Sequence, residues 1–120
     1  MKLLIIRHGD PDYACDTVTE KGKREISLLA DMLKKQGVDY LYTSPLGRAK
    51  DTCAATAEAI GKTPVVMNWL EEFDHRIDLP TGEKNHLIWD MLPAYWTSVP
   101  EMYDNEKWLD LPEMKAGNMR

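Results

Sequence analysis

The chain has 120 residues, of which 15 are Lys or Arg and 20 are Asp or Glu, giving a formal net charge of −5 at pH 7. This length fits one domain with a modest core and excludes a second full domain. The acidic balance, without a basic tail or stripe, argues against a nucleic-acid partner. The apolar run near the start is only about a third of a membrane span and lacks a cleavage site, so we expect no signal peptide and no membrane anchor.

Residues 3–6 are four consecutive apolar residues. The run is too short for a helix, and its apolar character on both faces predicts a central parallel strand that is covered on each side. Arg7, His8 and Gly9 follow directly. Two side chains that prefer water therefore stand where a buried strand is expected to end.

A first helix is predicted between Thr19, which can act as its N-cap, and Gly37, which supplies a C-terminal stop. Apolar residues recur between them at the spacing of one helical face, namely Ile26, Leu29, Ala30 and Leu33.

Residues 38–43 and 63–68 predict a second and a third strand. Between them, Ser44 as N-cap and Pro45 at the first helical position predict a second helix that ends at Gly61. Its apolar face comprises Ala49, Cys53, Thr56, Ala57 and Ile60. This β-α-β-α-β order, with short connections, predicts a three-layer α/β/α fold with a mostly parallel sheet.

The composition changes after Glu72. Four prolines break any long helix, and three tryptophans stand among Leu, Met and Tyr: Pro80, Pro93, Pro100, Pro112, Trp89, Trp96 and Trp108. Linkers and disordered tails are poor in aromatic residues, so this segment predicts short helices and loops with the tryptophans in a core or an interface. The two cysteines, Cys15 and Cys53, have no metal-ligand spacing, and we expect reduced thiols in a cytoplasmic protein.

The residues that follow the first two strands predict an anion site, because ligands of open α/β sheets bind beyond the carboxyl ends of the strands. Arg48 stands in the first turns of a helix, where the macrodipole disfavours a cation unless an anion compensates. Phosphate fits the guanidinium groups of Arg7 and Arg48 and the free N–H groups at that helix end. We predict that Arg7, Gly9, Ser44 and Arg48 bind the phosphate group of a substrate.

Within such a site, His8 could attack phosphorus through one ring nitrogen if the other nitrogen donates to a backbone carbonyl. Glu71 and Glu72 follow the third strand, so either could protonate the leaving oxygen. Simpler interpretations exist: His8 could be a capping residue, Arg48 could pair with Asp51, and the two glutamates could form an ordinary acidic loop. Three weak signals at three successive strand ends favour the site.

These residues resemble the histidine phosphatase superfamily, the phosphoglycerate mutase-like proteins. "LLIIRHG" resembles its opening strand and nucleophile motif, "VTEKGKREISLLADML" its "LTxxGxxQA" helix, "YTSPLGRAKDTCAATAEAI" its "SxLxRAxxTA" helix and "WLEEF" its "LxE" motif. The resemblance covers residues 1 to about 75, and residues 76–120 resemble more loosely the aromatic-rich insertion of a phosphatase branch. It therefore implies a single domain over residues 1–120 that corresponds to the N-terminal half of the family.

Position by position, the resemblance implies that His8 is the phosphorylated nucleophile and that Arg7 and Arg48 are phosphate ligands. Glu72, the third letter of "LxE", becomes the proton donor. The family needs no metal or organic cofactor. Residues 10–13, Asp-Pro-Asp-Tyr, replace the Thr or Ser and the Asn that follow the nucleophile motif in many members, which favours a simple phosphate monoester over mutase activity.

The family also has a second catalytic histidine, usually followed by glycine, and this chain has no second His-Gly pair. His75 and His86 are its other histidines, and neither follows an apolar run. Typical members are longer, so the resemblance implies an incomplete sheet, impaired turnover and self-association through exposed apolar surface, as a homodimer or another assembly.

Three hypotheses follow. The first is a phosphatase that hydrolyses a phosphate monoester through phosphorylated His8. The second is a non-catalytic, truncated phosphatase-like domain that binds a phosphorylated ligand or a protein partner. The third is a fragment of a longer, ordinary phosphatase.

Overall fold

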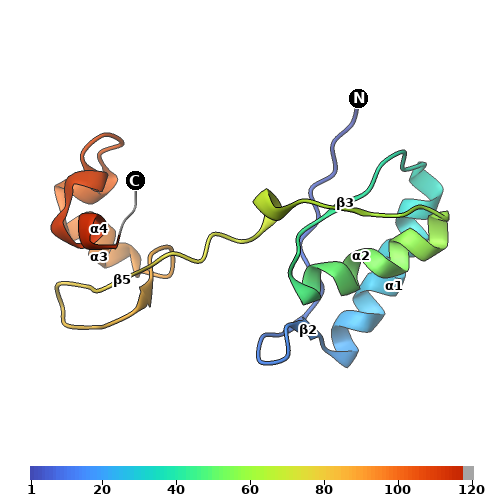
Figure 1. The fold of residues 1–120 in the computed structure, drawn as a ribbon, viewed down its shortest axis with the longest axis horizontal. Coiled ribbons are helices and arrows are strands. Elements are labelled where there is room, and N and C mark those ends of the chain that lie inside the picture. Colours follow the sequence, from blue (N-terminus) through green and yellow to red (C-terminus); the bar gives the residue numbers. More distant parts are fainter. Residues whose placement is uncertain (118–120) are drawn as a thin grey trace. The chain divides into compact units, whose positions relative to one another are not determined.

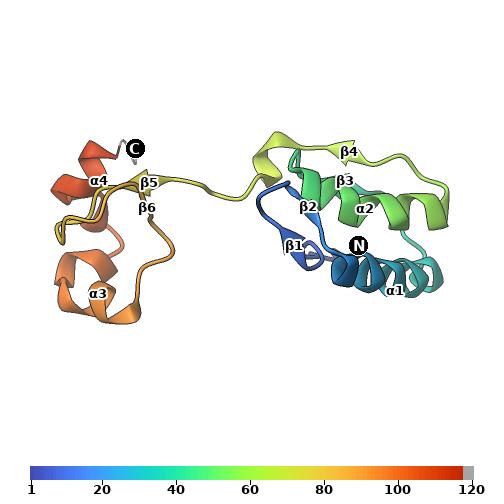
Figure 2. The same cartoon turned by 90° about the horizontal axis from the view of Figure 1, so that it is seen from below.

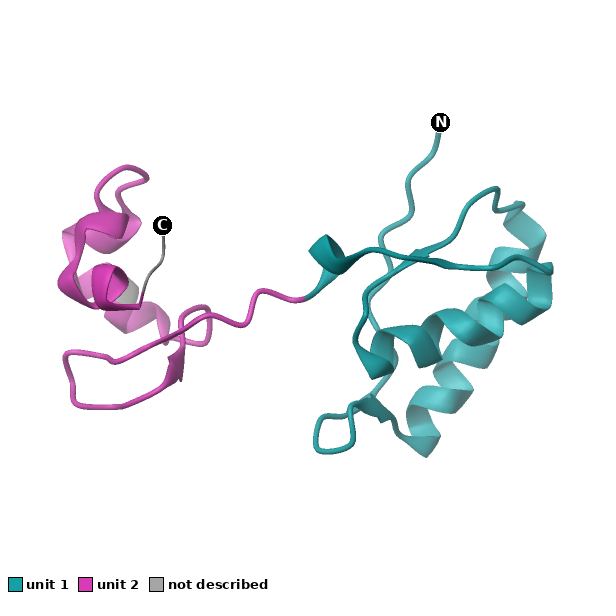
Figure 3. Ribbon diagram, viewed as in Figure 1, with its two compact units in different colours: residues 1–71 teal, residues 72–120 magenta. Residues whose placement is uncertain are grey.

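The computed structural model describes residues 1–117, and residues 118–120 lie outside the described part. The chain divides into two compact units, a first unit of residues 1–71 and a second unit that begins at Glu72 (Figure 3). Both contain helices and short two-stranded sheets, which makes the chain a mixed α/β protein. The prediction of one domain over residues 1–120 stays a prediction. Among residues 1–117, no helix is both long and apolar enough to cross a membrane.

The first predicted helix is confirmed as α1, Glu20–Gln36. The Thr19 hydroxyl accepts the backbone N–H of Gly22, which satisfies one of the unpaired donors at the helix start. Gly37 ends the helix in a left-handed conformation with φ of 70°, which glycine adopts without steric cost. The buried face contains Ile26, Ala30 and Leu33, as the spacing predicts.

The second predicted helix is present as α2, Gly47–Ile60, and it ends at Gly61 as predicted. Its predicted start is wrong, because Ser44 does not cap it and the N-cap position is Leu46. The Ser44 hydroxyl accepts only from the Leu46 N–H, at 3.3 Å, before the helix begins. Helices α1 and α2 pack against each other, and Figures 1 and 2 show them side by side.

The second and third predicted strands are confirmed as a parallel pair on either side of α2, but they are short. β3, Tyr42–Thr43, pairs with β4, Val65–Val66, with Tyr42 opposite Val65 and Thr43 opposite Val66. A turn of 3-10 helix, η1, follows at Asn68–Leu70. The β-α-β unit therefore forms with the predicted direction of pairing.

The first predicted strand is wrong in this structure. Residues 1–8 form no strand, and Leu3 and Ile5 are 76% and 90% exposed. A strand is held by ladder hydrogen bonds to a neighbour and is buried only if other layers cover it. No strand of the described residues pairs with residues 3–6, so their apolar side chains face solvent.

A hairpin that the sequence analysis missed lies between residues 3–6 and α1. β1, Pro11–Asp12, pairs antiparallel with β2, Thr17–Val18. Residues 13–16 connect the two strands and are called the 13–16 loop below. β2 packs on α2, so the hairpin lies beside the start of that helix (Figure 1).

The second unit consists of short elements, as predicted for the proline- and tryptophan-rich segment. β5 and β6 form an antiparallel pair, helices α3 and α4 each have Pro at the first position, and two 3-10 turns separate them (Figure 2). Their bounds are Arg76–Ile77, His86–Leu87, Pro93–Ser98, Pro112–Ala116, and for the turns η2 and η3 Pro100–Tyr103 and Trp108–Asp110.

The second unit has its own apolar core. Six buried side chains form it, namely Ile77, Leu79, Ile88, Met91, Met102 and Met114. Trp108 is partly buried against this core, which agrees with the expected place of a tryptophan, whereas Trp89 is half-exposed. The Trp96 side chain lies outside the described part.

Candidate phosphate-binding and catalytic site

His8 lies where the extended N-terminal segment meets the helices, and its ring is half-buried. Its Nδ1 lies 2.8 Å from the carbonyl oxygen of Gly9. A carbonyl can only accept, so Nδ1 carries the hydrogen and Nε2 keeps its lone pair in the neutral ring. This is the hydrogen bond that a nucleophilic histidine was predicted to need.

Gly9 is needed for close packing. It is buried, and a Cβ built on it would lie 3.0 Å from Ile26 Cγ2 and 3.2 Å from the carbonyl oxygen of Gly22, both on α1. The φ of Gly9 is not positive, so the backbone conformation does not itself require glycine. The missing side chain instead lets the backbone beside His8 approach α1.

Thr52, which the sequence analysis missed, ties the same backbone to α2. Its hydroxyl accepts the N–H of Gly9 at 3.0 Å and donates to the carbonyl of Arg48 at 2.7 Å. The residue is only 6% exposed, so these bonds are shielded from competing water. A polar residue one turn after Arg48, on a helix face that packs inward, was the available signal in the sequence.

Arg48 occupies the second position of α2, and its side chain is 12% exposed. Its Nη1 donates to Asp16 Oδ1 at 2.7 Å, and Asp16 Oδ2 accepts the Gly47 N–H at 2.6 Å. Asp16 thereby caps α2 and compensates the cation there. The predicted need for a negative group at this helix end is met from within the chain by Asp16, and phosphate binding by Arg48 stays a prediction.

The electrostatics of this contact favour the charged form of Asp16. Its pKa lies below the usual value for aspartate, first because the Gly47 N–H hydrogen-bonds the carboxylate and then because of Arg48. Arg48 also lies over the ring of Tyr13, with the guanidinium carbon 5.3 Å from the ring centroid. The side chain is therefore fixed by a carboxylate and an aromatic ring, both from the 13–16 loop.

Tyr13 also contacts His8, and so links the two candidate residues. The Tyr13 and His8 rings are 6.2 Å apart between centroids and nearly perpendicular. Such an edge-to-face arrangement is favourable for two rings. His8 and Arg48 therefore lie on one aromatic side chain, as well as being joined through Gly9 and Thr52.

Asp10 and Asp12, the two remaining carboxylates near the His8 motif, accept local hydrogen bonds. Asp10 accepts from the Thr19 hydroxyl at 2.6 Å and from Lys21 Nζ at 3.1 Å, and these contacts, the Thr19 bond first, lower its pKa. Asp12 Oδ1 accepts the N–H of Ala14 at 3.0 Å. Asp10 and Asp12 thus stabilise the hairpin and the start of α1.

The other predicted site residues are more dispersed. Arg7 is exposed and adjoins His8 in the chain, and Ser44 lies before the start of α2. Glu71 ends the η1 turn, where its N–H donates to Asn68, and Glu72 is the first residue of the second unit. Their roles as phosphate ligands or proton donors stay predictions.

A model of the Histidine phosphatase superfamily (branch 1) matches residues 3–106. The chain belongs to this superfamily. It is 29% identical over 84 residues to Phosphoserine phosphatase 1 of Hydrogenobacter thermophilus, a match that covers 62% of this chain and 40% of the relative. It is 26% identical over 96 residues to a probable phosphoglycerate mutase GpmB of Cronobacter sakazakii, covering 72% of this chain and 43% of the relative.

A solved structure, Mycobacterial hydrolase 1, matches with a TM-score of 0.50 and 22% identity, covering 76% of this chain and 43% of that chain. This similarity shows the fold. The chain thus spans less than half the length of these three proteins.

The other two histidines of this superfamily member lie in the second unit and make local contacts there. His75 Nε2 is hydrogen-bonded to the Gly117 carbonyl, and its ring stacks on Phe73. His86 bonds through both ring nitrogens, to Glu83 and to the Asp90 carbonyl.

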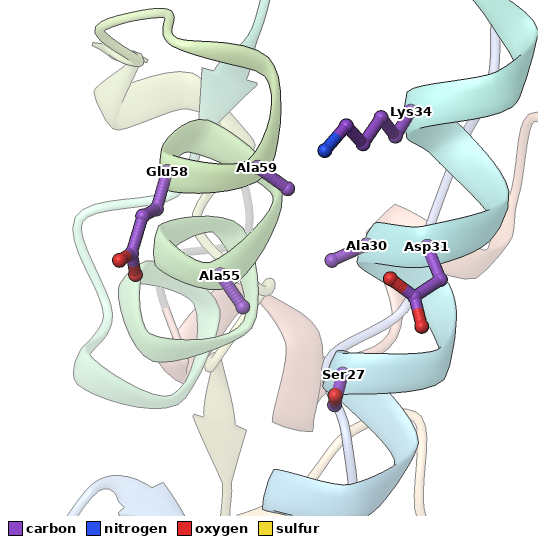
Figure 4. Close-up of a pocket in the computed structure, with 7 residues that line it drawn as sticks. All are labelled: Ser27, Ala30, Asp31, Lys34, Ala55, Glu58 and Ala59. Atoms are coloured by element: carbon purple, nitrogen blue, oxygen red, sulfur yellow. The ribbon is translucent and has the colours of Figure 1, made fainter.

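A cavity of about 450 Å³ opens between α1 and α2 (Figure 4). Its lining combines small and charged side chains, namely Ser27, Ala30, Asp31, Lys34, Ala55, Glu58 and Ala59. None of the candidate site residues belongs to it. Within residues 1–117, no group of three or more His, Cys, Asp or Glu side chains could hold a metal ion.

Proposed function

We propose that this histidine phosphatase superfamily member hydrolyses a phosphate monoester at His8. Nε2 of neutral His8 attacks phosphorus, the bond from phosphorus to the ester oxygen breaks, and the leaving oxygen takes a proton from a carboxylic acid. Water then attacks the phosphohistidine and gives its proton to that carboxylate, which releases inorganic phosphate and restores His8. The substrate class is a simple phosphate monoester.

The hydrogen bond from His8 Nδ1 to the Gly9 carbonyl carries the proposal. It selects the tautomer in which Nε2 is the nucleophile, and the carbonyl can stabilise the positive charge that the ring gains in the phosphorylated state. The tethers from Gly9 to Thr52 and from Thr52 to Arg48 keep this backbone in place beside a cation.

The proposal assigns phosphate binding to Arg7 and Arg48, with Gly9 and Ser44 beside them. Guanidinium groups match phosphate oxygens in pairs of N–H donors, and phosphoryl transfer depends mainly on such positioning and charge stabilisation. Glu72 is the proposed acid, with Glu71 as the alternative. No metal or organic cofactor is part of the proposal, and a cytoplasmic location belongs to it as well.

We expect turnover to be slow, because the chain has no second His-Gly pair to complete the charge stabilisation. Removing one donor to a developing charge typically costs roughly 10²- to 10³-fold in rate. The proposed fold is three-layer α/β/α with a mostly parallel sheet, in which residues 3–6 would be a central strand that pairs with a neighbouring strand. A second copy could supply the missing neighbour, so we propose self-association.

The test is the hydrolysis of p-nitrophenyl phosphate by the 120-residue chain between about pH 5 and pH 8. We expect slow release of nitrophenol that His8→Ala abolishes, with acid-labile phosphate appearing on His8 during turnover. His86→Gln is the matched control, because His86 bonds within the second unit. Equal rates for the wild-type chain and His8→Ala would contradict the proposal.

A non-catalytic role is the second candidate, and the hydrogen bonds of Asp16 to Gly47 and Arg48 at the start of α2 favour testing it. In that case the chain binds a phosphorylated ligand or a protein partner without turnover. Calorimetric titration with inorganic phosphate distinguishes the two roles, since binding without hydrolysis supports the second. The intact mass of the native protein decides whether it is part of a longer phosphatase.

A further inference from the structure

The 13–16 loop contacts the first turn of α2 through two of its side chains. Asp16 accepts the Gly47 N–H at 2.6 Å and the Arg48 Nη1 hydrogen at 2.7 Å, and the Tyr13 ring lies under the guanidinium. Immediately after the loop, the Thr17 hydroxyl donates to Asp51, also on α2. Residues 31 or more positions apart in the chain thus join one hairpin to one helix end.

The backbone at this contact is built for close approach. Asp16 has φ of 47°, in the left-handed region that non-glycine residues seldom adopt. A Cβ on Gly47 would lie 2.0 Å from the carbonyl oxygen of Asp16, so only glycine fits there. Such strain persists where the surrounding contacts hold it, and these are the contacts with Gly47 and Arg48.

The contact fixes the direction of the Arg48 side chain. A guanidinium has five N–H donors in one rigid plane, so holding one edge against a carboxylate sets where the other donors point. The guanidinium carbon of Arg48 also lies over the Tyr13 ring, 5.3 Å from its centroid. A long arginine side chain has many rotamers, and contacts that restrict these rotamers beforehand lower the entropy cost of binding phosphate.

We propose that Asp16 is a positioning residue that, together with Tyr13, holds Arg48 in the orientation in which it binds the phosphate group. The inference rests on the proposed function, because it names what prepares the Arg48 side chain for that ligand. Asp16 stays in place while phosphate is bound and does not touch the reacting atoms.

The competing possibility is that Asp16 occupies the phosphate position and must leave before phosphate binds. Its departure would break the hydrogen bonds from the Gly47 N–H and from Arg48 Nη1 and lose the loop geometry at once. A carboxylate that caps a helix from a strained, closely fitted loop is more suitable as a permanent support. The two possibilities predict opposite changes in phosphate affinity when Asp16 is removed.

The experiment measures inorganic phosphate binding by calorimetry for the wild-type chain, Asp16→Ala, Arg48→Ala and the double variant. We expect Asp16→Ala to weaken binding roughly tenfold or more, the usual scale for losing a hydrogen bond to a charged group. In the Arg48→Ala background, Asp16→Ala should have little further effect, because Asp16 acts through Arg48. Asp16→Asn keeps an acceptor for the Gly47 N–H and should retain part of the affinity.

Two results would overturn the inference. Tighter phosphate binding by Asp16→Ala would mean that Asp16 competes with phosphate. Equal losses from Asp16→Ala with and without Arg48 would mean a general effect on folding. Asp12→Ala is the matched control, because Asp12 is a carboxylate of the same hairpin that caps Ala14. It should weaken binding less than Asp16→Ala does.

A separate readout covers failure of the proposed function. Nuclear magnetic resonance of the arginine Nε–H groups reports how rigid the Arg48 side chain is without any ligand. We expect a rigid Arg48 in the wild-type chain and a mobile one in Asp16→Ala. If the wild-type chain does not bind phosphate while Arg48 is rigid, the proposed function fails and the positioning contact stands. If Arg48 is equally mobile in both chains, the positioning contact itself is wrong.

Discussion

The two units of the chain solve the problem of burial in opposite ways. The first unit has the long helices α1 and α2 but leaves large apolar side chains outside these helices exposed, including Ile5 at 90% and Val65 at 50%. The second unit has only short elements, yet it buries Met114 completely. Long helices therefore do not ensure a closed core. A helix depends largely on its local sequence, whereas a core needs apolar side chains packed against it from every side.

The units also differ in what holds them together. Around His8 and Arg48 the first unit relies on polar tethers, in which Thr52 and Asp16 join segments distant in the chain. The second unit relies on apolar packing among its core residues. Substitutions should therefore have their largest effect on stability in the second unit and their largest effect on ligand binding in the first.

Met114→Ala is the substitution with the largest expected effect on stability. Met114 is fully buried in the core of the second unit, and deleting such a side chain removes apolar burial and leaves a cavity. We expect a loss of about 2–5 kcal/mol in the free energy of unfolding. Urea denaturation monitored by tryptophan fluorescence measures this loss, because three of the four tryptophans belong to this part of the sequence.

Ile5→Ala is the control for Met114→Ala. It also shortens an apolar side chain, but at a position that is 90% exposed, so the free energy of unfolding should change by less than about 0.5 kcal/mol. A loss as large as that of Met114→Ala would mean that residues 3–6 are buried in solution, and the contrast between the units would disappear.

Ile5→Ser tests what covers the exposed segment. If residues 3–6 bind a second copy of the chain, a polar side chain at this position should weaken self-association while leaving the monomer folded. Sedimentation velocity over a range of micromolar concentrations measures the change. Leu28→Ser, an exposed apolar position on α1, should leave the association unchanged. A wild-type chain that sediments as a monomer throughout would remove the proposed self-association.

The helices were predictable from the sequence because their signals are local. Thr19 and Gly37 bound α1 as predicted, and Gly61 ends α2. The start of α2 was not predictable from its neighbours, since its cap comes from Asp16 and not from Ser44. The sequence of a helix does not indicate a capping residue that comes from a distant loop.

For the candidate site, the sequence indicated the kinds of residue involved better than the contacts between them. An arginine at a helix start implied a compensating anion, and the structure supplies one in Asp16. Choosing Asp16 from the acidic residues required the hairpin of β1 and β2, whose two-residue strands carry no periodic signal. The prediction of a strand at residues 3–6 was wrong for a related reason, because the burial of this segment depends on neighbouring strands that its own four residues do not specify.

The smallest expected effect concerns the polar contacts of the second unit, at His86. Its two ring nitrogens contact Glu83 Oε1 at 2.7 Å and the Asp90 carbonyl at 3.0 Å, so the doubly protonated ring satisfies both acceptors. These bonds, the one to Glu83 first, raise the pKa of His86 above its usual value. The stabilisation is therefore complete below the unfolded-state pKa, about 6.5, and is lost as the pH rises through the higher folded-state pKa.

The urea midpoint should fall slightly between about pH 6 and pH 8.5, and less in His86→Gln, which cannot titrate. An equal fall in both chains would place the pH dependence at another group and leave apolar packing as the main support of the second unit.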